Sequence, residues 1–312
     1  MVTHNHRGRA QLILVGALLL ATVILGLSML LNSMLLTGAT GDTGATAAIE
    51  ETDFVDYDVE MSMRELVVRL NHEERNRTPE ELGAVVATET DHFSRALAEA
   101  RARSGSVAIA VEYNNSSSSF GRRIVQAENA GISDSGGSRD WDLIDGGGRV
   151  GWFSLSVNTT ASQDGDTLVV EAVNQSSGDD VSVTLDVNGT GVDVTPGGGN
   201  TEYCEGERGR VLIDVYAGRG FTDDCGFTGI GSLDWPDTLN LDANDEFVGK
   251  YAVVVSESTT QVESVTDSCG PGVDPDPCRA PAIWEANVTT SVQSNPVSYQ
   301  NTANLTVYTN DR

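Results

Sequence analysis

The segment GWFSLSVNTT, residues 151–160, has the pattern that decides the fold. Phe153, Leu155 and Val157 fall on one face of an extended chain. The two serines between them fall on the other face, together with Asn158. Because successive side chains of a strand point to opposite sides of a sheet, this alternation predicts a strand with one buried and one exposed face.

Further segments of the same kind follow one another along the chain, separated by turns rich in Gly, Asp, Ser and Asn. They are SVAIAVEY (106–113), TLVVEAV (167–173), VSVTLDV (181–187), RVLIDVY (210–216), KYAVVVSES (250–258), ANVTTSV (286–292) and NLTVYT (304–309). Many short alternating strands joined by such turns are typical of an antiparallel, sandwich-like sheet.

Two helices are expected before the strands. Met63, Leu66, Val67 and Leu70 recur at helical spacing. The sequence Thr78-Pro79-Glu80-Glu81 is a capping box with proline at the first helical position, and it predicts a helix to about Arg103. The apolar stripe of this second helix comprises Leu82, Val85, Val86, Phe93, Leu97 and Ala100, and Gly105 is expected to end it.

The N-terminal segment predicts a membrane span. Residues 12–36 contain no charged side chain. As a helix they would be about 37 Å long, enough to cross a hydrocarbon core of about 30 Å. The run is longer than the apolar part of a removable secretion signal. A buried core helix is the alternative, but no other uncharged run in the chain approaches this length.

Charge flanking this span predicts its orientation. Arg7 and Arg9 precede it and all acidic residues follow it, so the N-terminus is expected in the cytoplasm. The predicted organisation is α+β, with a basic leader over residues 1–10, a transmembrane helix over 11–36, a linker over 37–58, a helical segment over 59–104 and a mainly antiparallel, β-rich extracellular domain over 105–312. The predicted location is the cell membrane, with the bulk of the chain outside.

The junction Gly8-Arg9-Ala10-Gln11 resembles the class III signal of archaeal type IV pilins and pilin-like proteins. The segment RGRAQLILVGALLL, together with VGWFSLSVN (150–158) and CRAPAIWEANVTT (278–290), resembles sequences of a group of uncharacterised haloarchaeal surface proteins. The resemblance implies leader cleavage between Ala10 and Gln11, or between Gly8 and Arg9, with the helix retained. It also implies a structural or adhesion role at the cell surface and other pilin-like subunits as partners.

The charge balance favours a halophilic surface. The chain has 46 acidic and 19 basic residues, and Lys250 is its only lysine. After residue 36 the balance is 17 − 46 = −29. At molar salt the screening length shrinks to about 3 Å, which removes most of the self-repulsion of such a domain. No basic patch is evident to neutralise phosphates, so nucleic acid is excluded as a partner.

The four cysteines, Cys204, Cys225, Cys269 and Cys278, predict two disulfides in an extracellular domain. Their spacing lacks the tight pairs of a zinc site, and no histidine follows His92 to complete a ligand set. Three pairings are open. We favour the two local ones, Cys204–Cys225 and Cys269–Cys278, because each closes a short loop.

N-glycosylation sequons predict a glycoprotein. They occur at Asn76, Asn114, Asn115, Asn158, Asn174, Asn188, Asn287 and Asn304. All lie on the side of the span that we assign to the exterior. Where they fall in alternating segments, as Asn158 and Asn188 do, the alternation places them on the solvent face.

Catalytic signals are weak, and we expect no enzyme and no cofactor. His72 begins a sequence like that of a metalloprotease helix but lacks the second histidine four residues on. The acidic stretches near Asp242 and Asp276 complete no calcium loop, so no metal is expected. Trp152, Trp235 and Trp284 are expected to be core or rim aromatics, one of them suited to line a glycan-binding surface. The alternatives to a pilin-like subunit are a tethered module that binds an extracellular glycan or protein without assembling, or a hydrolase using a carboxylate pair.

Overall fold

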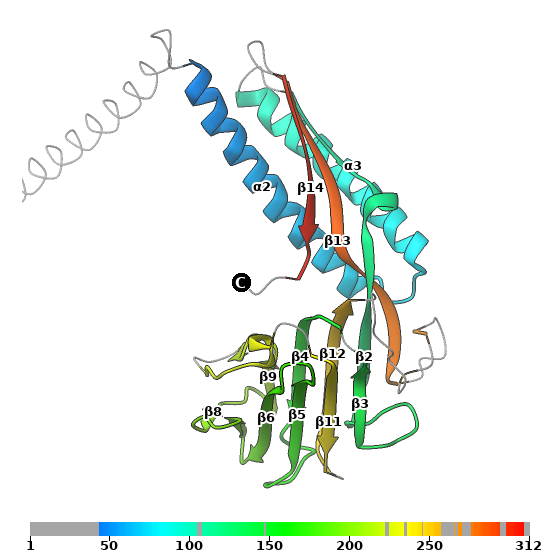
Figure 1. Cartoon of the computed structure of the whole chain (residues 1–312), viewed down its shortest axis with the longest axis vertical. Coiled ribbons are helices and arrows are strands. Elements are labelled where there is room, and N and C mark those ends of the chain that lie inside the picture. Colours follow the sequence, from blue (N-terminus) through cyan, green and yellow to red (C-terminus); the bar gives the residue numbers. More distant parts are fainter. Residues whose placement is uncertain are drawn as a thin grey trace, which may run out of the picture. The chain divides into compact units, whose positions relative to one another are not determined.

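Figure 1 shows a computed structural model of the chain, which describes residues 44–104, 108–146, 148–221, 225–233, 236–244, 246–256, 265, 268–269, 276–293 and 298–308. The chain divides into two compact units, Met1–Tyr57 and Asp58–Arg312. The predicted leader, cleavage site and membrane helix lie outside the described residues. None of the helices that are described is long and apolar enough to cross a membrane.

Helix α2 (Gly44–Glu73) begins inside the segment for which the sequence predicted a linker, so that prediction is wrong from residue 44 onward. Glycine is costly in the interior of a helix, but Gly44 stands at its first position. The residues after it include no glycine or proline, and several are alanines and glutamates, which are good helix formers. The predicted stripe is confirmed in the second unit, where Met63 and Val67 are fully buried.

Helix α3 (Pro79–Ser104) confirms the predicted capping box. The Thr78 N–H donates to Glu81 Oε2 over 2.9 Å, and the Glu81 N–H donates to Thr78 Oγ1 over 3.2 Å. Two of the helix's orphan donors are thereby satisfied reciprocally. Leu82 and Val86 are buried on the predicted face.

The strands form two antiparallel sheets, which together with the two described helices confirm the α+β class. Sheet A has the order β1-β13-β2-β12-β4-β9-β10, with β14 also paired to β13. Its strands are β1 (Ala108–Tyr113), β2 (Ser119–Gly131), β4 (Val150–Asn158), β9 (Arg210–Asp214), β10 (Arg219–Gly220), β12 (Val248–Ser256), β13 (Cys278–Gln293) and β14 (Ser298–Thr306). Sheet B has the order β3-β11-β5-β6-β7-β8. Its strands are β3 (Asp140–Asp145), β5 (Thr167–Asn174), β6 (Asp179–Asn188), β7 (Gly191–Pro196), β8 (Glu202–Cys204) and β11 (Thr238–Ala243).

One hydrophobic core lies between the two sheets. It joins Phe153 and Leu155 of β4 to residues of sheet B such as Leu168 and Leu241, all at most 1% exposed. Removing such side chains from water is the main favourable contribution to folding. The alternation in the segment 151–160 therefore correctly predicted which face of β4 packs into the core. The opposite face of β4 points away from the core.

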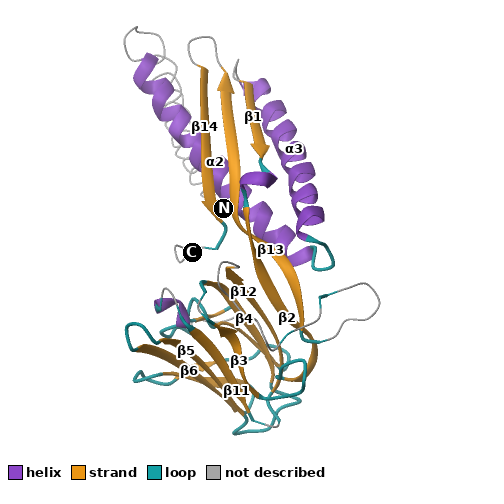
Figure 2. Cartoon of the chain, turned by 45° about the vertical axis from the view of Figure 1, so that its right-hand side comes forward, coloured by secondary structure: helices purple, strands orange, loops and turns teal. Residues whose placement is uncertain are grey.

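Strand β13 changes partners along its length. Its first half pairs with β2, and from Val288 onward it pairs with β1 instead, while β14 lies on its other side from Glu285. Figure 2 shows β1, β13 and β14 side by side, with α3 running along them. The long strand thus extends sheet A beyond the sandwich into a part that α3 covers.

The side-chain amide of Asn71 bonds to the backbone of β13 at Ile283, just before the point where β14 begins to pair with β13. The Asn71 side chain is fully buried; its Oδ1 accepts from the Ile283 N–H over 2.8 Å, and its Nδ2 donates to the Ile283 carbonyl over 2.9 Å. It also donates to Tyr308 Oη over 3.1 Å. Asn71 therefore takes the place of a neighbouring strand's peptide group and fixes the end of α2 to β13.

Candidate functional site

The outward face of sheet A carries an open groove of about 650 Å³, which we call the Trp152 groove. Side chains from α2, β2, β4, β9 and β12 line it, together with the residue that follows β10. Those used below are His72, Glu73, Arg75, Arg123, Trp152, Ser154, Ser156, Leu212, Phe221, Lys250 and Ala252. Its volume falls in the range of small-molecule binding sites.

Small side chains form the floor of the groove. Ala252 lies between Val125 of β2 and Ser154 of β4 in the strand register, and Lys250 lies opposite Ser156. The period of two sends Lys250 and Ala252 outward while Tyr251 between them enters the core. The hollow lies where the small side chains of Ala252, Ser154 and Ser156 come together on neighbouring strands.

Aromatic and apolar side chains bound the groove. Trp152 is half-buried and meets the His72 ring edge-on, with ring centroids 4.3 Å apart. Leu212, which is 40% exposed, and Phe221, which is 51% exposed, also line it. Large apolar side chains gathered in this way on a surface indicate a contact site, whereas single ones do not.

The groove is cationic although the chain is strongly acidic. Arg75, Arg123 and Lys250 line it, and Glu73 is the one acidic side chain among its described lining residues. The formal net charge of the whole chain is −27. The local sign of the charge is therefore opposite to that of the molecule.

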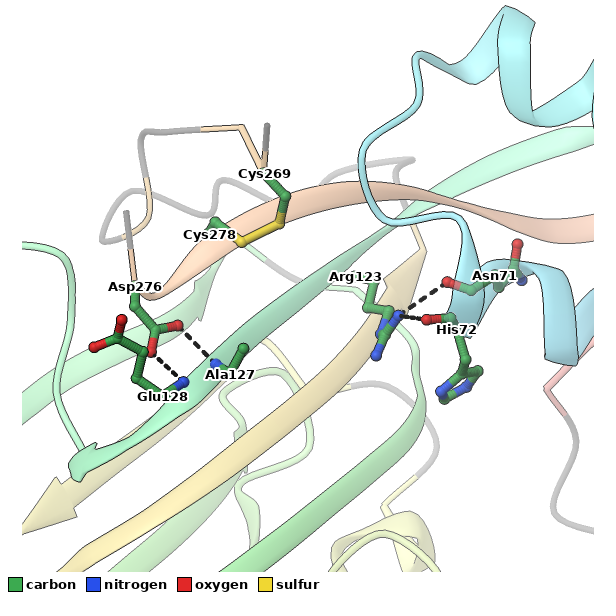
Figure 3. The surroundings of a disulfide bond; sticks show 8 residues. All are labelled: Asn71, His72, Arg123, Ala127, Glu128, Cys269, Asp276 and Cys278. Atoms are coloured by element: carbon green, nitrogen blue, oxygen red, sulfur yellow. Dashed lines mark hydrogen bonds between the residues drawn. A yellow bond between two sulfur atoms is a disulfide. The ribbon is translucent and has the colours of Figure 1, made fainter. Parts of the chain in front are cut away.

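Arg123 fixes the end of helix α2. Its Nη1 donates to the carbonyl oxygens of Asn71 and His72, over 3.1 and 2.7 Å (Figure 3). Cations are favourable at the last turn of a helix, where carbonyls are left unpaired. Burial lowers the pKa of Arg123, and the like charge of Arg75 acts in the same direction. Its side chain is 8% exposed, and Nε has no hydrogen-bond partner.

A second pocket of about 470 Å³ lies beyond Trp152 and Phe221, which line both cavities. Much of its wall comes from two stretches, residues 214–221 and 227–232. Between these stretches the Phe227 N–H donates to the Gly218 carbonyl over 2.8 Å, and the Gly231 N–H donates to the Tyr216 carbonyl over 3.0 Å. Gly218 has φ of +72°, a conformation that favours glycine.

Both favoured disulfide pairings are confirmed. Cys204 of sheet B is bonded to Cys225, which precedes by two residues Phe227, a lining residue of the second pocket. Cys269 is bonded to Cys278 at the start of β13 (Figure 3). Beside it, the Asp276 carboxylate accepts from the Ala127 and Glu128 N–H groups over 2.7 and 2.5 Å. Asp276, two residues before β13, is thus tied to β2 next to Ala127, a lining residue of the Trp152 groove.

The sequon asparagines differ in exposure. Those at 76, 114, 115, 188 and 304 are exposed, and those at 174 and 287 are intermediate. Asn158 is 8% exposed, so its predicted place on the solvent face is wrong. The physical reason is that β4 ends there: Asn158 Oδ1 accepts from the Thr160 N–H, the Ala161 N–H and Thr160 Oγ1, which turns the side chain into the bend.

Two sequons meet across β13 and β14. Asn287 and Asn304 are opposite one another in the register, and Asn287 Nδ2 donates to Asn304 Oδ1 over 2.6 Å. Asn114 lies close by, because its N–H donates to the Asn287 carbonyl over 2.9 Å. The fold therefore gathers several sequons that are far apart in the sequence.

The remaining predicted positions include two histidines that the structure describes, His72 and His92. Ala10 and Gln11 lie outside the described residues. His72 packs against Trp152, and His92 lies on α3 beside Glu89. In the part of the chain that the structure describes, no three His, Cys, Asp or Glu side chains are grouped as metal ligands. Trp284 is buried, whereas Trp152 lines the groove.

Sequence reasoning missed most of the groove. Trp152 was expected as a rim aromatic, but Arg123, Leu212 and Phe221 were not singled out. The available signal was Lys250, the only lysine of the chain, which stands at an outward position of an otherwise apolar strand.

The fold and the groove define a disulfide-containing α+β protein with an open, ligand-sized cavity on its sandwich. A family model described as a family of unknown function (DUF7261) matches residues 6–130. The matched segment includes α2, α3 and most of β2 but ends before Trp152 and Lys250. No curated protein and no solved structure is significantly similar to the chain.

Proposed function

We propose that the chain is a membrane-anchored, non-enzymatic cell-surface protein of the pilin-like kind, which acts in adhesion by binding an extracellular ligand in the Trp152 groove. The observation that carries the proposal is the groove itself. It combines exposed aromatic and aliphatic side chains, a floor of small residues and a local positive charge. A site built this way can hold a ligand.

Two further features support a location outside the cell. Both disulfides join cysteines that follow the predicted membrane span, and disulfides persist in oxidising compartments. The acidic excess also lies entirely after the span. Anchoring by residues 11–36 rests on the length and hydropathy of that stretch.

Lys250 allows a direct test of topology. A membrane-impermeant amine reagent applied to intact cells should modify Lys250 and leave the cytoplasmic N-terminal amine unmodified. The Lys250→Arg variant should then show no label until the cells are permeabilised. Labelled lysates report the intrinsic reactivity of Lys250, so a signal in lysates but not in intact cells would contradict the surface location.

Adhesion is tested with the same cells. Trp152→Ala should lower their attachment to a surface while leaving the amount of labelled protein unchanged. Tyr203→Ala is the matched control, because Tyr203 is a 46% exposed aromatic on β8 that does not line the groove. Equal attachment of the two variants would argue against a binding role for the groove.

Whether the anchored protein also assembles is a separate question. Gly8-Arg9-Ala10-Gln11 favours pilin-like processing, after which the apolar helices of several subunits would pack together. Close packing of helices in lipid relies on small side chains. The double substitution of Ala17 and Ala21 by leucine should leave the protein in the membrane and remove it from sheared filaments. If the wild-type protein is absent from that fraction, the chain is a simple tether.

A further inference from the structure

Two cations at the Trp152 groove have no anionic partner among the described residues. Lys250 is half-buried and forms no hydrogen bond or ion pair with any described side chain. Arg123 is 8% exposed, and in the described chain only backbone carbonyls accept from it. Burying a charge without a counterion is costly, because the charge loses the stabilisation that water provides. An anion in the groove would recover part of that loss.

Arg123 and Lys250 would act on a bound anion in different ways because they lie at different depths. Arg123 Nε is buried, so this guanidinium acts from beneath the surface through its charge. Lys250 reaches the groove from the floor, opposite Ser156. Ser156 Oγ in turn accepts from Arg210 Nη1 over 3.4 Å. A bound anion would thus contact the ammonium group of Lys250 directly, and the buried charge of Arg123 would attract it from beneath the surface.

The aromatic side chains of the groove favour a ligand that also has an apolar surface. Trp152 and the exposed Phe221 line the groove together with Ala252 and Ser154, two small side chains that lie opposite one another in the strand register. A sugar ring has an apolar C–H face that packs against an aromatic ring and hydroxyl groups that bond to serine. An acidic peptide would form ion pairs with the cations, but its carboxylate side chains would offer no apolar face to pack against Trp152 and Phe221.

We propose that the Trp152 groove binds an acidic saccharide, with Lys250 contacting a carboxylate or sulfate group and Trp152 and Phe221 packing against the sugar rings. The inference rests on the proposed function and names the ligand class of that same site. Screening at molar salt leaves only contacts within about 3 Å effective, so Lys250 acts through a direct charge-assisted bond. The aromatic walls, which salt does not weaken, provide the rest of the affinity.

Calorimetry on the full-length protein in detergent at molar salt tests the inference. The probes are a short oligogalacturonate, a sulfated galactan fragment, a neutral galactan of the same length and a polyglutamate peptide. We expect at least one acidic saccharide to bind about tenfold more tightly than the neutral one. Lys250→Gln should weaken that binding about tenfold and leave binding of the neutral saccharide unchanged.

Arg208→Gln is the matched control, since it removes one positive charge from a side chain that is 91% exposed and does not line the groove. Equal effects of the two variants, equal binding of acidic and neutral saccharides, or no saccharide binding would each overturn the inference. Tighter binding of polyglutamate would replace it by an acidic polypeptide. Surface labelling of Lys250 distinguishes failure of this inference from failure of the proposed function. If Lys250 is labelled on intact cells but the protein binds no acidic saccharide, the ligand class is refuted and the surface location is not.

Discussion

Replacing Asn71 by alanine tests how helix α2 is joined to the sheet. The side chain is fully buried and bonds to both backbone groups of Ile283 and to Tyr308 Oη. In the Asn71→Ala variant the Ile283 N–H and carbonyl lose these partners at a point where β13 has not yet begun to pair with β14. Among the described residues, no strand pairs with β13 at Ile283 on the side that Asn71 occupies.

The magnitude follows from the number of unpaired groups. Each buried backbone group left without a partner costs about 1–3 kcal/mol, so the variant should lose about 2–6 kcal/mol of unfolding free energy. For a domain of this size the corresponding fall in Tm is about 5–20 °C. The loss of van der Waals contacts of the amide adds to this value, and entry of water into the space reduces it.

Thermal denaturation of the full chain at molar salt, followed by circular dichroism, measures the effect. Asn76→Ala is the control, because Asn76 lies just after α2 and is exposed. We expect its Tm to stay within about 2 °C of the wild-type value. A similarly small change for Asn71→Ala would refute the conclusion that this amide supports the ladder.

Four further outcomes are expected. Tyr251 Oη is buried without a hydrogen-bond partner, so Tyr251→Phe should raise the unfolding free energy by about 1 kcal/mol in denaturant titrations. Burial raises the pKa of Tyr251, so the unfolded chain ionises first; stability should fall as pH rises above about 10, and less steeply in Tyr251→Phe. Lowering salt from molar to about 0.1 M should reduce Tm because repulsion within the acidic domain is no longer screened, and a salt-independent melting curve would contradict this. Glycopeptide mass spectrometry should find Asn158 unmodified and glycans, where present, at exposed sequons such as Asn188; high occupancy at Asn158 would contradict its buried position.

The parts of the fold that the sequence predicts are those governed by local patterns. Alternation located β4, β5 and β6, and the capping box located the start of α3. Strand β2 was missed because Arg123 and Gln126 are buried within it and interrupt the expected polarity. Gln126 occupies a bulge, where its Nε2 donates to the carbonyls of Ala130, Gly131 and Gly249. A polar residue that satisfies an irregular backbone is indistinguishable, in sequence, from one on the surface.

The groove was less predictable because its parts come from distant segments. His72 and Trp152 are separated by eighty positions along the chain, and Lys250 follows almost a hundred later. Arg123 could not be assigned to the end of α2, since the contact depends on how β2 passes beneath that helix. The disulfides were predicted because local loop closure requires no knowledge of the sheet order.

The attachment of α2 to β13 also has a mechanical meaning. Tension applied along α2 from an anchored N-terminus would reach the last turn of the helix, where Asn71 and Arg123 hold strands β13 and β2. Strand β13 is sixteen residues long and is paired with β2, β1 and β14. The load would therefore pass into an interior strand and be shared by several ladders in shear. An edge strand in the same place would peel away one hydrogen bond at a time. The connection would therefore suit the role proposed above, in which an anchored protein is pulled while its ligand is held.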